Sequence, residues 1–71
     1  MTRNVYVVRL PNEGFVGGSA SHVWCSRYDA PVDFSHARVF LSRQGASGIA
    51  RSSGGEILAC SVTLNLTGLG G

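Results

Sequence analysis

Strict alternation over residues 56–67, EILACSVTLNLT, is the feature that most constrains the fold of this chain. Every second position from residue 58 is apolar: Leu58, Cys60, Val62, Leu64 and Leu66. The positions between them are small or polar: Ala59, Ser61, Thr63, Asn65 and Thr67. A period of two is that of a β-strand with one buried face. The segment therefore predicts a strand whose leucine-bearing face is core and whose other face meets water or a partner.

Three earlier segments also have strand character. Residues 4–10, NVYVVRL, are rich in β-branched and aromatic residues and stop at Pro11, which cannot donate to a sheet ladder. The turn-forming PNEG follows, and FVGG resumes the apolar run, which predicts a hairpin with a second strand at 14–18. HVWCSRY, residues 22–28, alternates less regularly and predicts a third strand with an aromatic face. Residues 29–33, DAPVD, form the loop after it.

One helix is expected between residue 42 and the glycine pair 54–55. Ser42 is a suitable N-cap, because its hydroxyl can accept from a backbone N–H two or three residues later. Apolar residues cluster on one side of the helical wheel, namely Ala46, Ile49 and Ala50, and a left-handed glycine can end the helix. Before it, Asp33 or Ser35 can cap a short turn over 34–38. That turn would deliver three residues to the core: Val39, Phe40 and Leu41.

These elements predict an α+β fold in β-β-β-α-β order. A chain of 71 residues makes a single domain, and a single helix can cover only one face of a sheet. We expect a small three- to four-stranded, mainly antiparallel sheet with the helix packed on one face. The uncovered face should be polar or semi-polar and available to a partner. Residues 68–71 should form a frayed tail.

The net charge, the apolar runs and the number of cysteines exclude several classes of protein. A net charge of +2 is too small for a dedicated nucleic-acid binder and has the wrong sign for an acidic DNA mimic. No apolar run approaches the ~20 residues of a membrane span, and nothing resembles a signal peptide, so a cytoplasmic location is expected. The two cysteines, Cys25 and Cys60, do not make a disulfide framework and are expected to be small buried hydrophobes in strands.

The residues that could carry chemistry do not form a convincing motif. His22 and Cys25 have H-x-x-C spacing, but a structural zinc site usually has two close ligand pairs, so no metal is predicted. Asp33, Ser35 and His36 are acid, nucleophile and base types, yet a triad also needs a preorganised oxyanion site. The glycine-rich GFVGGS lacks the spacing and the long helix of a phosphate-binding loop. We therefore expect a protein that is not an enzyme and has no cofactor.

Arginines and aromatic residues are the candidate partner-binding residues. The candidates are Arg27, Arg38, Arg43, Arg51, Trp24 and Tyr28. On the expected helix, Arg43, Ser47 and Arg51 follow one another at i, i+4 and i+8 along one ridge. Arginine with aromatic residues is enriched in protein-binding hot spots, and the same mixture binds single-stranded nucleic acid. Solvated charge beside a helix, with Trp24 in the core, is the alternative that needs no function.

The order of several segments resembles small αβ proteins encoded in phage and prophage accessory regions. The segments are NVYVVRLPNEGFVGGS, HVWCS, HARVFLSRQGA and ILACSVTLNL, and the most specific is ARVF, Ala37 to Phe40, before a capped helix. Where such proteins have an assigned activity, they often inhibit host defence, and some are anti-CRISPR proteins that block DNA recruitment by the effector complex. The resemblance implies a non-enzymatic inhibitor that binds a host protein complex in the cytoplasm of an infected bacterium. A small nucleic-acid-binding module is the alternative.

Overall fold

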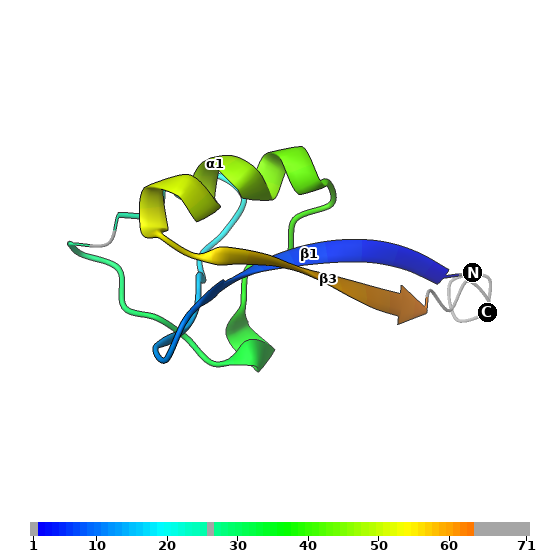
Figure 1. Cartoon of the computed structure of the whole chain (residues 1–71), viewed down its shortest axis with the longest axis horizontal. Helices are drawn as coiled ribbons and strands as arrows, with labels where there is room; N and C mark the ends of the chain where they lie inside the picture. The colour runs from blue at the N-terminus through cyan, green and yellow to red at the C-terminus, as the bar shows by residue number, and fades with distance from the viewer. Residues whose placement is uncertain (1, 26, 64–71) are drawn as a thin grey trace.

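The computed structural model describes residues 2–25 and 27–63. It has a three-stranded antiparallel sheet with one α-helix across one face, which confirms the predicted α+β class (Figure 1). The strands are β1 (Thr2–Leu10), β2 (Gly14–Phe15) and β3 (Glu56–Thr63), and the helix is α1 (Arg43–Ser53). A short 3-10 turn, η1 (Phe34–His36), lies within the predicted turn at 34–38. The strand order in the sheet is β2-β1-β3, so β1 is central.

β1 pairs with β3 along almost its whole length. The register runs from Thr2 opposite Thr63 to Arg9 opposite Glu56, and these last two side chains form an ion pair. The predicted strand at 4–10 is therefore confirmed and begins slightly earlier. The chain between these two strands contains β2, η1 and α1, and α1 ends directly before β3.

On its other side, β1 is paired with short pieces of chain. β2 has two residues, so the strand predicted at 14–18 was wrong in length. The N–H of Val16 still donates to the Val8 carbonyl of β1 at 3.0 Å. The Val16 carbonyl instead accepts from the backbone N–H of Arg38, so the chain leaves the ladder after Phe15. Gly18 then takes a positive φ of 96°, a conformation open mainly to glycine, which turns the chain away.

The segment 22–28 is not a strand, and that prediction was wrong. The N–H groups of Tyr28 and Asp29 both donate to the Cys25 carbonyl, at 2.9 and 2.8 Å, which closes a turn. The Asp29 carboxylate also accepts from the Cys25 N–H at 2.6 Å. Local hydrogen bonds to an aspartate compete with a sheet ladder, and here they prevail over the alternating pattern.

α1 has the ends that its sequence predicts. The Ser42 hydroxyl accepts from the Gly45 N–H at 3.1 Å, and Gly54 closes the helix in the left-handed conformation at φ 73°. Ala46 and Ala50 are buried and Ile49 packs against them. Gly55 allows the close return of the chain onto the sheet, since a Cβ there would lie 2.6 Å from Cγ1 of Val8.

The core lies between α1 and the sheet face beneath it. It contains Val8, Leu10, Val16, Trp24, Phe40, Ala46 and Ala50, with Tyr6, Ile49 and Ile57 packed against it. Of the three residues expected to enter the core after the short turn, only Phe40 does; Val39 and Leu41 are 54% and 63% exposed. Extended chain points successive side chains to opposite sides, and Phe40, opposite Tyr6, takes the helix side.

The alternation in β3 is confirmed, and its apolar face is the more buried one, since Leu58 and Cys60 are half-buried and Ala59, Ser61 and Thr63 are exposed. That apolar face is the one away from α1. Ile57 lies opposite Val8 and shares its face under α1, whereas Leu58 and Cys60 lie opposite Val7 and Val5 on the other face. The face away from α1 is consequently apolar along its middle, not polar or semi-polar as expected. The predicted continuation of the strand over 64–67 and the frayed tail at 68–71 lie outside the described residues.

Candidate partner-binding surface

Two of the candidate arginines lie together on α1. Arg43 and Arg51 are exposed, with half-buried Ser47 between them, and we call these three residues the helix ridge. Together with Ala50, Gly55 and Ile57 they line a shallow hollow between the helix and the start of β3. Within residues 2–25 and 27–63, neither guanidinium has an ion-pair or hydrogen-bond partner. The hollow thus combines two planar donors, without partners in this part of the chain, with the apolar side chains of Ala50 and Ile57.

Arg38 is used inside the molecule. Its guanidinium donates to the carbonyl oxygens of His22 and Ala20, at 2.8 and 2.9 Å, and lies 4.7 Å from the centre of the Phe40 ring. A planar, multidentate donor suits this role, because it satisfies two carbonyls of an irregular loop while stacking on an aromatic face. Arg38 therefore ties the 20–22 loop to the core and is not available to a partner in this arrangement.

Trp24 is a core residue. Its side chain is 6% exposed and belongs to the hydrophobic cluster under α1. The indole N–H has no acceptor among the described residues. A buried donor without a partner costs about 1–3 kcal/mol, so the ring is held there by its apolar contacts. The structure does not present Trp24 as an exposed anchor.

Arg27 and Tyr28 are exposed in the turn that Asp29 closes. The Tyr28 side chain is 85% exposed. Asp29 accepts from the Cys25 N–H and from Nε2 of His22, the latter at 2.7 Å. The Cys25 N–H, and to a lesser extent His22, hold the pKa of the Asp29 carboxyl below its ordinary value. The turn is thus an ordered element that displays one arginine and one aromatic ring, separate in sequence from the helix ridge.

The acid, hydroxyl and imidazole groups at η1 are close to one another but are not arranged for catalysis. The Ser35 hydroxyl donates to Asp33 at 2.9 Å and lies 3.2 Å from Nδ1 of His36, which also contacts the Asp33 carboxylate. A triad needs the hydroxyl and the acid at different ring nitrogens, and here both meet Nδ1. The His36 contact, followed by the Ser35 hydroxyl, lowers the pKa of Asp33. This cluster stabilises a turn.

The remaining candidates are a metal site, the two thiols and a membrane-spanning helix. In the part of the chain that the structure describes, no three His, Cys, Asp or Glu side chains gather as metal ligands would. Cys25 and Cys60 are half-buried free thiols; Cys60 lies in β3, but Cys25 lies in the turn that Asp29 closes, so its predicted place in a strand was wrong. No helix among the described residues has the length and apolar character needed to cross a bilayer.

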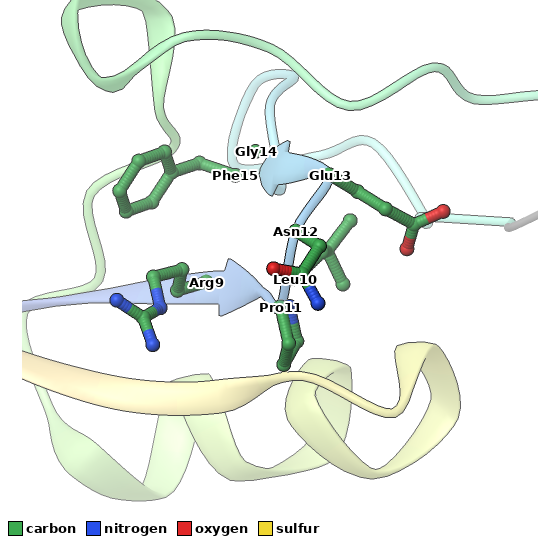
Figure 2. Close-up of a pocket in the computed structure, with 7 residues that line it drawn as sticks. All are labelled: Arg9, Leu10, Pro11, Asn12, Glu13, Gly14 and Phe15. Carbon is green, nitrogen blue, oxygen red and sulfur yellow. The ribbon is translucent and has the colours of Figure 1, made fainter.

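The tip of the β1–β2 hairpin forms a second shallow hollow (Figure 2). Arg9 and Phe15 extend to the same side of the hairpin, as expected for residues in register, while Glu13 points away. Arg9 is already paired with Glu56, and Asn12 turns the chain at a φ of 62°. The polar groups here do not converge on a common point, so the hollow is a feature of the turn.

Sequence reasoning missed the apolar sheet face away from α1. It carries Val5 and Val7 from β1, with Leu58, Cys60 and Val62 from β3. A signal was present in the first strand, where Val5, Tyr6, Val7 and Val8 are consecutive and leave neither face polar. A strand that is apolar on both faces is typical of a sheet that is covered on both sides.

Comparisons of the chain with family models, with curated proteins and with solved structures give no match.

Proposed function

We propose that this protein is a small non-enzymatic inhibitor that binds a protein complex of a bacterial host through the helix ridge. The observation that carries the proposal is the pair Arg43 and Arg51, which have no ion-pair or hydrogen-bond partner among the described residues and lie beside the apolar side chains of Ala50 and Ile57. The capped helix holds them eight residues apart, which is about 12 Å at 1.5 Å per residue. Little ordering of the backbone is then needed on binding, and a preorganised surface binds more tightly.

The chemistry of the ridge fits an acidic partner. A guanidinium forms paired hydrogen bonds with a carboxylate or a phosphate, and it retains its charge at all physiological pH values. An acidic site on a host complex, or a site that normally holds nucleic-acid phosphates, would match two such groups. The resemblance to phage accessory proteins supports a CRISPR effector complex, whose recruitment of DNA the bound protein would block in the bacterial cytoplasm.

A protein partner is favoured over nucleic acid for one structural reason. Binding of single strands by stacking would use exposed aromatic rings, and Trp24 lies in the core, which leaves Tyr28 as the exposed ring of the two candidates. Binding to nucleic acid is the alternative, and it can be tested by measuring the affinity for an oligonucleotide at increasing salt concentrations. Affinity for an oligonucleotide would fall steeply with added salt if phosphate contacts dominated binding.

The proposal can be tested by a phage-plating assay in a bacterium with an active CRISPR system. Cells that express the protein should be infected by a targeted phage, and cells that express the double variant Arg43→Glu/Arg51→Glu should not. Arg3→Glu, an exposed residue of β1, is the control for a change of charge and should retain the activity. Failure of the unaltered protein to protect the phage would contradict the anti-CRISPR assignment. Equal protection by the double variant would exclude the ridge.

A further inference from the structure

The outer edge of β3 has no strand beside it within the described residues. β3 is the last strand in the order β2-β1-β3. An edge strand presents a row of unpaired N–H and C=O groups that can pair with another chain. The edge of β3 is eight residues long, which exceeds a typical strand of about five or six.

The backbone groups that point outward can be identified from the register. Tyr6 exchanges backbone hydrogen bonds with Phe40, on the side of β1 away from β3. Ala59 lies opposite Tyr6, so its own N–H and C=O point away from β1, toward the free edge. Every second residue of β3 does the same, which gives the outward set Ile57, Ala59, Ser61 and Thr63.

This edge lacks the features that usually block pairing. Natural edge strands carry charged side chains, prolines or bulges that discourage association. Residues 57–63, ILACSVT, contain no charge, no proline and no glycine. Glu56 precedes them and is paired with Arg9 of the same chain.

Part of the sheet has only two strands and is not covered by α1. β1 and β3 extend beyond the N-terminal end of α1 as a two-stranded ribbon (Figure 1). Such a ribbon is marginally stable by itself in water. Val62, on its face away from α1, is 36% exposed. Another strand beside β3 would widen the ribbon and cover part of this surface.

We propose that the edge of β3 pairs with β3 of a second copy of this chain to form an antiparallel dimer. A two-fold axis perpendicular to the sheet makes two identical strands antiparallel. The register that uses all four outward residues of each copy is centred on Cys60. In that register Ile57 faces the second copy's Thr63, and Ala59 faces the second copy's Ser61.

The side chains are compatible with this register. On the face away from α1, Cys60 meets Cys60 of the second copy, and Leu58 meets its Val62, so apolar groups are neighbours. On the helix side, Ala59 and Ser61 are small, and no like charges oppose one another. Ile57 packs against the core under α1 and lies opposite the far end of the second strand, which keeps the two helices at opposite ends of the interface.

The first test compares two proline variants of the full chain by analytical ultracentrifugation. Proline is tolerated in an edge strand where its missing N–H would point outward. Ala59→Pro removes an outward N–H of β3, and should raise the dimer dissociation constant by at least about tenfold, because each dimer loses two hydrogen bonds. Asn4→Pro removes an N–H that points to the opposite edge, and should leave the dimer intact. A monomeric unaltered protein, or equal effects of the two prolines, would overturn the proposal.

The second test fixes the register and does not depend on a proline. Directly opposed residues of a non-hydrogen-bonded pair have Cα atoms about 4.5 Å apart, within the range for a disulfide. In Cys25→Ser, copper phenanthroline should link Cys60 across the dimer, as the two thiols give two protons and two electrons to the oxidant. Cys60→Ser, which keeps Cys25, should not be linked. A dimer that resists this oxidation would overturn the register.

The dimer is independent of the proposed inhibitor function. Arg43→Glu/Arg51→Glu alters the ridge and leaves the outward groups of β3 unchanged, so its dimer dissociation constant should equal that of the unaltered protein. Loss of phage protection with an unchanged dimer constant would separate the two surfaces. A protective protein that is monomeric would overturn only the dimer.

Discussion

Tyr6 and Phe40 donate backbone hydrogen bonds to each other, at 2.8 and 2.7 Å, and so attach the chain before α1 to the central strand. This exchange places the Phe40 ring on the helix side of the sheet, where it is buried and supports the Arg38 guanidinium. It also places Val39 and Leu41 on the opposite side. One backbone pairing therefore decides which of three consecutive apolar residues enters the core.

Truncation of Phe40 and truncation of its neighbour Val39 should have very different effects on stability. Phe40→Ala should lower the free energy of unfolding by about 3–5 kcal/mol, because it leaves a cavity in the core. That loss is large for a domain of this size. Val39→Ala, at a position more than half exposed, should change it by about 0.5 kcal/mol or less. Urea denaturation followed by circular dichroism measures both, and similar losses in the two variants would contradict the assigned faces.

Two glycines should respond oppositely to alanine. Gly48 lies inside α1, is exposed and has no atom within 4 Å of where a Cβ would be, so Gly48→Ala should stabilise the protein by about 0.5–1 kcal/mol. At Gly55 a Cβ would lie 2.6 Å from Cγ1 of Val8 and 2.9 Å from the Arg9 carbonyl oxygen. Gly55→Ala should therefore lower the midpoint of thermal unfolding, whereas Gly48→Ala should raise it. A fall with Gly48→Ala would show that the helix is packed differently.

Arg38 should act through the 20–22 loop. Arg38→Ala removes both guanidinium hydrogen bonds and the stacking on Phe40, and should cost about 1–2 kcal/mol, since the side chain is partly exposed. Arg38→Lys should retain only part of this stability, because an ammonium group lacks the planar, forked set of donors of a guanidinium. Amide hydrogen exchange should rise in residues 20–22 and stay unchanged in α1. Uniformly faster exchange would indicate a different role.

Stability should fall in acid because of Asp29. Its pKa is lowered in the folded state, so between that pKa and the ordinary value the unfolded chain binds more protons. The stabilisation is complete above the ordinary aspartate pKa of about 3.9 and is lost as the pH falls through the folded pKa. Asp33, whose pKa is also lowered, adds to the same trend. Between pH 6 and pH 2 the midpoint of thermal unfolding should change less in Asp29→Asn than in the unaltered protein. The same pH dependence in both proteins would contradict a role of Asp29.

The predictable parts of the fold are those that local chemistry decides. Ser42 and Gly54 define the ends of α1 through contacts within a few residues, so their types alone revealed the helix. Alternation in β3 identified a strand with two faces, but the choice of the face under α1 depends on which residue lies opposite Val8. That register is a long-range property that a period of two does not contain.

The candidate partner-binding residues were likewise only partly predictable from the sequence. Arg43 and Arg51 share a ridge because helical spacing puts them there, and the structure keeps them together. Arg38 could not be separated from them by sequence, because its acceptors at Ala20 and His22 are distant along the chain. The strand-like pattern at 22–28 concealed the turn that Asp29 closes, whereas the burial of Trp24 was already one of the two alternatives.

The most direct measurement of the central claim is co-purification with a CRISPR effector complex from cells that express both. The unaltered protein should be retained in stoichiometric amounts, and Arg3→Glu should match it. Arg43→Glu/Arg51→Glu, shown to be folded by circular dichroism, should bind at least about thirtyfold more weakly, as the loss of a hot-spot arginine costs ~2 kcal/mol or more. Retention of the double variant at the level of the unaltered protein would contradict binding through the helix ridge.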